Sequence, residues 1–290
     1  MDSEQTINNK SLERFNNYKK QPLKFKFPSN FNGSLPIMNF KKEVKAAVIR
    51  EKGINSEREM AYMLNLSGFK VKDVHMTDLV SGRETLKDIN MLVFPGGFSN
   101  SDVLGSAKGW AGAFKFNEKA KKTIQNFYKK ENTLSLGVCN GCQLMMELDL
   151  LYPNQIENHP KMEHNHSNKF ECTFSSIDII KSNSIMLKNL EDTTLGIWSA
   201  HGEGKFNLKS KEVNIAAKFH YNEYPGNPNG SDKSTAAICS KDGRHLAIMP
   251  HLERSIFPWN WAHYPRERND KISPWILPFY NARKWLEENA

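Results

Sequence analysis

The residue best placed for covalent chemistry is Cys139, at the centre of a Gly-x-Cys-x-Gly motif. An apolar run precedes the motif and a helix-forming stretch, residues 143–148, follows it. This strand–turn–helix layout is that of an elbow that holds a nucleophile at the carboxyl end of a sheet. Gly137 and Gly141 fit it because the turn is tight and neighbouring chain must pass without Cβ atoms. The dipole at the start of the helix favours a thiolate, so the motif predicts a cysteine nucleophile.

A cysteine nucleophile needs a base and hydrogen-bond donors for an oxyanion. The base candidate, His251, follows an apolar strand, and Glu253 lies two residues further on. Because residues i and i+2 of an extended chain face the same side, we expect Glu253 to hold the imidazole while its other nitrogen faces Cys139. A Pro-Gly-Gly turn ends another apolar run. We expect the backbone N–H groups of Gly97, in that turn, and of Asn140 to be the oxyanion donors.

Three other interpretations of these residues stay open. Cys139 could be a buried structural cysteine, although packing alone does not explain its two glycines. The Cys-x-x-Cys spacing with Cys142 is also found in zinc sites and in redox dithiols. The histidines that could complete a zinc site are His159, His164 and His166. No second cysteine pair lies nearby and the histidines are unevenly spaced, so we predict no metal site.

The charge, the apolar runs and the cysteine content of the chain exclude several classes of protein. The 290 residues carry a net charge of +8, and residues 1–45 hold nine Lys/Arg against four Asp/Glu, or +5 of that total. We therefore expect residues 1–43 to be a flexible basic linker and no nucleic acid to be bound. The absence of an apolar run of about 18 residues predicts no membrane contact. Four cysteines and a polar beginning, MDSEQTINNK, predict a cytoplasmic protein.

Beyond residue 43, apolar runs alternate with amphipathic stretches. Strands are expected at residues 46–49, 71–75, 91–94 and 133–137, and helices at 56–67, 117–130 and 275–288. Ser56 and Glu59 form the sequence of a capping box. Short strands are expected at 170–180, 195–199, 213–219, 235–239 and 246–249. This order predicts one α/β domain, residues 44–290, with a doubly wound, mostly parallel sheet and an added strand-rich portion.

The combination of Gly-x-Cys-x-Gly, Pro-Gly-Gly and a late His-x-Glu resembles the class I (triad) glutamine amidotransferases, which have a flavodoxin-like fold. Longer strings, from about residue 45 to the end, resemble the glutaminase domains of the phosphoribosylformylglycinamidine synthase family. They are PGGFSNSDVLGSAKGWA (95–111), LGVCNGCQ (136–143), HGEGKF (201–206), YPGNPNGS (224–231) and MPHLER (249–254). That family converts formylglycinamide ribonucleotide (FGAR), ATP and glutamine into formylglycinamidine ribonucleotide (FGAM) in purine biosynthesis.

The resemblance implies a role for each matching residue. Cys139 attacks the side-chain amide of L-glutamine, His251 transfers the proton, and Glu253 orients His251. Gln143 and Phe98 are implied to contact the substrate. No cofactor is expected on this chain, because ATP and magnesium bind the synthetase portion of the family, fused or separate, which is the implied partner.

His201 and Glu203, in HGEGKF, admit two interpretations. They could be a second acid–base pair, but we expect a turn near the glutamine or near the contact with the synthetase portion. The alternatives for the chain as a whole are a cysteine hydrolase of the same fold, similar to peptidases or deglycases, and a non-catalytic binding module.

Three positions depart from the family pattern. Leu252 stands where Pro is usual, so the turn that aims the histidine is less stiff. Asn100 and Ser101 stand where Tyr-Gly is usual before the aspartate, so we expect strained backbone in that loop.

Overall fold

One mixed sheet forms the centre of the computed structural model, which describes residues 2–17, 19–209 and 212–290. Its strands are β1 (Lys45–Arg50), β2 (Lys70–His75), β3 (Met91–Phe94), β4 (Leu134–Val138), β6 (Glu171–Ile179), β7 (Thr193–His201), β9 (Asn214–Phe219), β10 (Thr235–Cys239) and β11 (His245–Ile248). They lie in the order β2-β1-β3-β4-β11-β10-β9-β6-β7. The strands from β2 to β11 are parallel, and the pairs from β11 to β7 are antiparallel.

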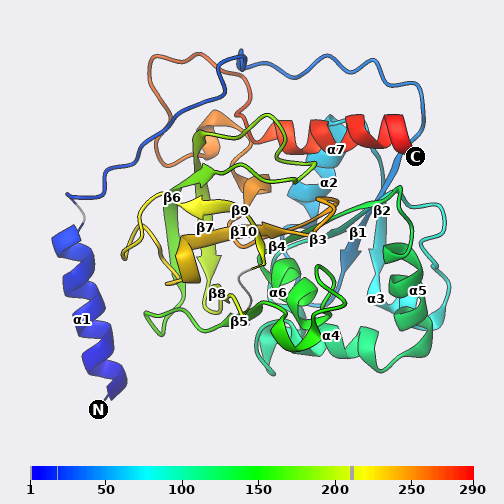
Figure 1. The fold of residues 1–290 in the computed structure, drawn as a ribbon, viewed down its shortest axis with the longest axis horizontal. Helices are drawn as coiled ribbons and strands as arrows, with labels where there is room; N and C mark the ends of the chain where they lie inside the picture. The colour runs from blue at the N-terminus through cyan, green and yellow to red at the C-terminus, as the bar shows by residue number, and fades with distance from the viewer. Residues whose placement is uncertain (1, 18, 210–211) are drawn as a thin grey trace.

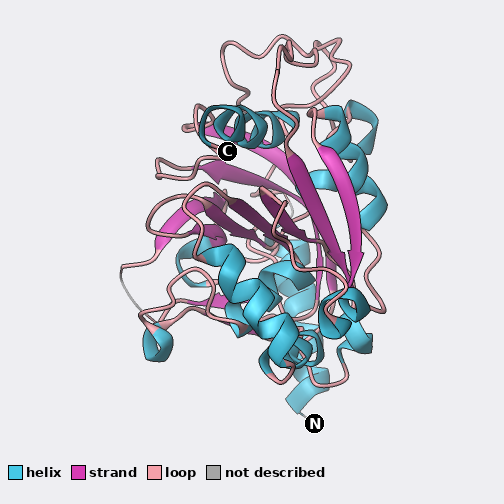
Figure 2. Ribbon diagram, turned by 90° about the vertical axis from the view of Figure 1, so that its right-hand side faces the viewer, coloured by secondary structure: helices cyan, strands magenta, loops and turns pink. Residues whose placement is uncertain are grey.

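Helices cover both faces of this sheet (Figures 1 and 2). They are α2 (Glu57–Leu66), α3 (Met76–Ser81), α4 (Lys108–Lys115), α5 (Glu118–Tyr128), α6 (Asn140–Glu147) and α7 (Ile276–Asn289). A further helix, α1 (Asp2–Asn17), stands apart from the sheet in Figure 1. In Figure 1, α2 and α7 lie above the strands, and α4 and α6 lie below them. Every residue of β3, β4, β10 and β11 is buried, as expected for strands covered on both faces. None of the helices in the described residues is long and apolar enough to cross a membrane.

The predicted fold class is confirmed: a largely parallel α/β sheet continues into a strand-rich portion. Every strand expected from the sequence is present within a few residues of its predicted bounds. Four features were not predicted from the sequence: α1, α3, α4 and the small antiparallel sheet of β5 (Lys161–Glu163) and β8 (Lys205–Asn207). These elements are short or polar, so their periodicity is weak.

The predicted capping box at the start of α2 was wrong. Ser56 is the N-cap residue, but its side chain makes no capping bond. Its Oγ instead accepts a hydrogen bond of 2.8 Å from the backbone N–H of Gly96. Ser56 therefore ties α2 to the Pro-Gly-Gly turn, a contact across 40 residues of sequence that a local pattern does not reveal.

An aromatic strap, residues 24–31, crosses the antiparallel half of the domain. The rings of Phe25 and Phe27 lie 5.2 Å and 5.6 Å from the ring of Trp261 in edge-on contacts. Phe31 is buried, and Lys26 forms a bridge with Thr194 of β7. These residues lie within the 1–43 segment for which a flexible linker is predicted, and here they pack on the domain. The division of the chain at residue 43 stays a prediction.

Candidate active site

Cys139 occupies the sharp turn between β4 and α6. Its backbone has φ 53° and ψ −108°, a strained conformation for a residue with a side chain. A Cβ at Gly141 would overlap the carbonyl oxygen of Phe94 on β3, and one at Gly137 would come within 2.6 Å of the Gly141 oxygen. Both glycines therefore permit the close approach that the Gly-x-Cys-x-Gly motif predicts. The Cys139 thiol is 3.6 Å from the carbonyl oxygen of Ala200, at the end of β7.

The structure brings Cys139, His251 and Glu253 together, as the sequence predicts. Nδ1 of His251 is 2.6 Å from Oε1 of Glu253, and both side chains are buried. A Cβ placed on Gly96 would lie 2.5 Å from Cε1 of His251 and 3.2 Å from Cβ of Cys139. Only a glycine leaves room for the imidazole to lie beside the sulfur.

Electrostatics favours a charged imidazole in this group. Burial alone would lower the pKa of His251, but the charges of Glu253 and Cys139 and its hydrogen bonds to both raise it to about 10. Burial acts against the charged form of Glu253 as well. The His251 charge and hydrogen bond outweigh that effect and hold the pKa of Glu253 below its usual value. An imidazolium bonded to a carboxylate is the arrangement that orients a catalytic histidine.

The turn that presents His251 differs from the predicted one. Residues Leu252–Arg254 form a 3₁₀ turn, η4, and not the extended chain that was predicted to place His251 and Glu253 on one side. That prediction of local structure was wrong, although the predicted contact between His251 and Glu253 is present. Leu252, in place of the usual Pro, is fully buried. Two hydrogen bonds fix the histidine backbone: its N–H donates to the Trp198 oxygen (2.7 Å), and its own oxygen accepts from Ser255 Oγ (3.2 Å).

Gly97 lines the same cavity as Cys139, and Asn140 directly follows Cys139 in the chain. Gly97 has φ 142°, and a Cβ on it would lie 2.6 Å from the Gly53 oxygen, so the position requires glycine. In the part of the chain that the structure describes, no hydrogen-bond acceptor is assigned to its N–H. Asn140 begins α6, where the first N–H groups have no partner within the helix. Among the described residues, both backbone N–H groups are therefore free to donate a hydrogen bond, and their role as oxyanion donors stays a prediction.

The loop after Gly97 is strained, as expected from its departure from the family pattern. Its residues with side chains and positive φ are Asn100, Ser101, Asp102, Ser106 and Ala107. Such conformations cost about 1–3 kcal/mol each and persist only where contacts fix them. The side chain of Asn140 supplies some: Oδ1 accepts from the Ser99 N–H (3.1 Å), and Nδ2 donates to Asp102 (3.1 Å).

A cavity of about 360 Å³ opens beside Cys139 and His251. Phe98, which is 45% exposed, and Gln143 both line it. Gln143 is held from both ends of its amide: Oε1 accepts from Asn140 Nδ2, and Nε2 donates to the Glu203 carbonyl oxygen, each at 2.8 Å. The two predicted substrate-binding residues therefore both reach this cavity.

His201 and Glu203 also line the cavity but do not bond to each other. Neither ring nitrogen of His201 has a hydrogen-bond partner among the described residues, and burial with the nearby His251 charge lowers its pKa to about 3. The Glu203 carboxylate accepts from the N–H and, at 2.6 Å, from the Oγ of Ser106. His201 and Glu203 therefore do not form an acid–base pair with each other, and burial favours the neutral form of His201.

Two buried asparagines that the sequence analysis missed hold this turn. Asn165 accepts from the Gly204 N–H (3.0 Å) and donates to the His201 oxygen (2.6 Å). Asn229 donates to the Gly204 oxygen (2.7 Å). The string NPNGS contained the signal for Asn229, but nothing local indicated its partner.

The histidines considered for zinc binding do not converge on the cysteines. His159 is buried with Nδ1 bonded to the Pro160 oxygen, and His164 Nδ1 is 3.4 Å from Glu203. Cys142 is buried in the core, where burial raises its pKa. Among residues 2–17, 19–209 and 212–290, no group of three His, Cys, Asp or Glu side chains has the arrangement of a metal site.

The model of the CobB/CobQ-like glutamine amidotransferase domain matches residues 43–286. The chain belongs to the glutamine amidotransferase family. Its relatives include a probable phosphoribosylformylglycinamidine synthase of Arabidopsis thaliana, 43% identical over 92% of this amidotransferase chain and 21% of the relative. The human phosphoribosylformylglycinamidine synthase is 40% identical over 85% of this amidotransferase chain and 20% of the human protein. The amidotransferase chain thus spans about a fifth of the length of the curated relatives it matches.

Solved structures agree with the fold. A chain of the PurLQS structure from Thermotoga maritima matches with a TM-score of 0.66 at 23% identity, over 84% of this amidotransferase and 100% of that chain. A protein from Thermoplasma acidophilum described as a putative GMP synthase subunit matches with a TM-score of 0.56 at 14% identity. The match covers 86% of this amidotransferase and 96% of the Thermoplasma chain.

Proposed function

We propose that this chain is the glutaminase portion of a phosphoribosylformylglycinamidine synthase. It hydrolyses L-glutamine and supplies ammonia for the ATP-dependent conversion of FGAR to FGAM. The observation that carries the proposal is the group of Cys139, His251 and Glu253 beside a cavity, in a chain about 40% identical to synthases of that name.

The first half of the reaction forms a thioester. The Cys139 thiolate attacks the side-chain amide carbon of glutamine, and the developing oxyanion accepts hydrogen bonds from the N–H groups of Gly97 and Asn140. The imidazolium of His251 donates its proton to the amide nitrogen, which leaves as ammonia. Glu253 keeps the imidazole aimed at the reacting atoms, because its carboxylate is bonded to Nδ1.

The second half hydrolyses the thioester. His251, neutral after it has given up its proton, takes a proton from water, which attacks the thioester carbon. Glutamate is released and the imidazolium–thiolate pair is restored. Gln143, Phe98 and the turn with His201 and Glu203 form the cavity in which we place the glutamine.

The remaining chemistry belongs to a synthetase portion, on the same polypeptide or a separate one. We propose that this portion binds FGAR, ATP and magnesium and receives the ammonia, and that this chain binds no cofactor of its own. A cytoplasmic location stays a prediction.

Labelling with a glutamine-analogue electrophile tests the nucleophile. We expect mass spectrometry to find one adduct, on Cys139, and competition by L-glutamine. The matched control is Cys172, which is exposed and does not line the cavity. Label on Cys172 alone, or none, would contradict a glutaminase.

The division of labour is tested in the complete enzyme. Cys139→Ala is expected to abolish FGAM formation from glutamine and to leave FGAM formation from ammonium salts intact. Cys172→Ala should affect neither. Equal loss of both activities in Cys139→Ala would mean that Cys139 supports the fold or the synthetase and does not release ammonia.

A further inference from the structure

A second cavity, of about 800 Å³, lies at the opposite end of the parallel strands from Cys139. Its walls are α4, α5, residues 148–155 and residues 240–245, and none of them lines the first cavity. His245 begins β11 and is paired with Ser135 near the start of β4, whereas Cys139 follows the end of β4. At 3.3 Å per residue, about 13 Å of strand separates the two ends. Substrates of open α/β sheets bind at the carboxyl ends of the strands, so this cavity is not where the glutaminase substrate is expected.

A buried histidine with a free nitrogen faces this cavity. His245 is 4% exposed, and its ring lies against the ring of Tyr128 with centroids 4.5 Å apart. Its Nδ1 is 2.9 Å from Ser135 Oγ, which in turn is 2.8 Å from the Tyr128 hydroxyl. Nε2 has no hydrogen-bond partner in the part of the chain that the structure describes, although the ring lines the cavity. Nε2 is not among the buried polar atoms that lack a partner, so it reaches the solvent of the cavity, where a ligand atom can replace water as its hydrogen-bond partner.

The walls combine apolar and aromatic surface with positive charge. The apolar and aromatic side chains are Phe114, Ile124, Tyr128, Leu148, Leu150, Leu151 and Tyr152. The cationic ones are Lys115, Lys121, Lys129, Lys241 and Arg244, against Asp149 and Asp242. Lys121 lies on α5 and Lys129 is the C-cap residue of that helix, and neither ammonium has an ion pair or hydrogen bond among the described residues. An anion in the cavity therefore meets unneutralised charge.

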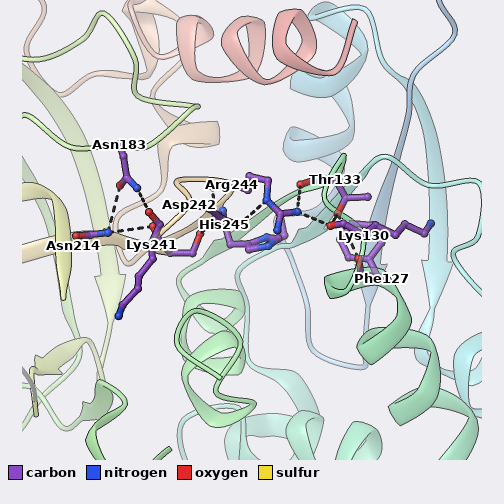
Figure 3. Close-up of polar contacts among 11 residues, drawn as sticks. Phe127, Lys130, Thr133, Asn183, Asn214, Lys241, Asp242, Arg244 and His245 are labelled. Carbon is purple, nitrogen blue, oxygen red and sulfur yellow. Dashed lines mark hydrogen bonds and ion pairs between the residues drawn. The ribbon is translucent and has the colours of Figure 1, made fainter. Parts of the chain in front are cut away.

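The turn that carries His245 is fixed before any ligand arrives. Arg244 donates from Nε to Asp242 (2.7 Å) and from Nη1 to the carbonyl oxygens of Lys130 (2.5 Å) and Thr133 (3.3 Å), as Figure 3 shows. These bonds join the β10–β11 turn to the segment between α5 and β4. A site whose walls are already held in place loses little conformational entropy when it binds.

We propose that this cavity is a second ligand site, separate from the glutaminase site, which binds a small anionic molecule with an aromatic ring. The ring packs among the apolar walls near Tyr128, a polar atom of the ligand bonds Nε2 of His245, and the anionic group lies at Lys121 and Lys129. Pockets of this size and mixed lining are typical of small-molecule sites.

The probe for this site is 1-naphthyl phosphate, titrated by fluorescence into the full 290-residue chain after Cys139 has been blocked with a glutamine-analogue electrophile. We expect saturable binding at about 0.15 M salt. Inorganic phosphate and 1-naphthol should each compete at least about tenfold more weakly. The first lacks the aromatic ring, and the second lacks the anionic group.

Charge reversal locates the site. Lys129→Glu is expected to weaken binding by at least about tenfold, since a charged hydrogen bond is replaced by repulsion. Lys122→Glu, on the same helix but outside the cavity, should have no effect. His245→Gln, with its fold checked by circular dichroism, should also weaken binding. Absence of saturation, equal loss in both lysine variants, or 1-naphthol binding as tightly as its phosphate would each overturn the proposal.

Discussion

The carboxylate of Glu203 holds Ser106 by both its N–H and its Oγ, the latter at 2.6 Å. Ser106 and Ala107 both have positive φ, and they end the strained loop that starts at Gly97, the proposed oxyanion donor. Because strained backbone persists only where contacts fix it, we expect Glu203 to act as a positioning residue for the proposed oxyanion site. Its own turn is held by Asn165 and Asn229, so the whole arrangement extends well beyond the triad.

Glu203→Gln should therefore lower kcat for glutamine hydrolysis about tenfold. The change replaces a charged acceptor by a neutral one at the Ser106 contact, which weakens two hydrogen bonds. Steady-state kinetics measures the effect, with unfolding temperature as the check on the fold. Glu163→Gln is the matched control, since Glu163 also accepts hydrogen bonds but lies outside the cavity. Equal kcat in the two variants would remove Glu203 from the oxyanion site.

Gly96→Ala should abolish measurable glutaminase activity while the chain remains folded. The new methyl group would lie 2.5 Å from Cε1 of His251 and 3.2 Å from Cβ of Cys139, so the imidazole must move away from the sulfur. Gly112→Ala is the control, because its Cβ meets nothing closer than 3.8 Å and lies in helix α4. Glutamine turnover and circular dichroism are measured for both. Wild-type turnover in Gly96→Ala would show that His251 does not act at Cys139.

The sequence predicted those parts of the site that depend on short-range backbone geometry. Gly137 and Gly141 constrain the elbow through contacts with adjacent chain, so their spacing around Cys139 is a local signal. The contact of His251 with Glu253 is equally local, although a 3₁₀ turn forms it and not the expected extended chain.

The parts that the sequence could not predict depend on partners far away in the chain. Ser56 has the sequence of a helix cap, yet its hydroxyl bonds to Gly96. Asn165 and Asn229 meet at Gly204 only because the antiparallel strands fold back on themselves. The sequence around Phe25 and Phe27 is that of a linker, but in the structure both rings pack on Trp261, more than 230 positions away. Local patterns carry no information about such pairings.

Glu253→Gln should reduce kcat by about 10²- to 10⁴-fold and change its pH dependence. The Glu253 charge is the main influence that raises the pKa of His251 against the effect of burial, so its removal lowers that pKa from about 10. The imidazolium needed to protonate the departing nitrogen is then lost at lower pH. The alkaline limb of the kcat profile should accordingly shift to lower pH. An unshifted limb in the variant would assign that limb to another group.

Two buried histidines should make the domain sensitive to acid. Burial lowers the pKa of His201 to about 3 and that of His245 to about 4, against 6.5 for an exposed histidine. Their contribution to stability is complete above pH 6.5 and is lost as the pH falls towards these values, because the unfolded chain binds the protons first. Between pH 6.5 and 5.0 each should cost about 1.5 kcal/mol of unfolding free energy. His251 has a raised pKa and loses its contribution only above pH 6.5, so it does not affect this interval.

Urea unfolding at the two pH values measures the loss. It should be smaller in His245→Gln than in His166→Gln, whose histidine is exposed, and an identical loss in the two variants would mean that His245 is already protonated in the folded chain.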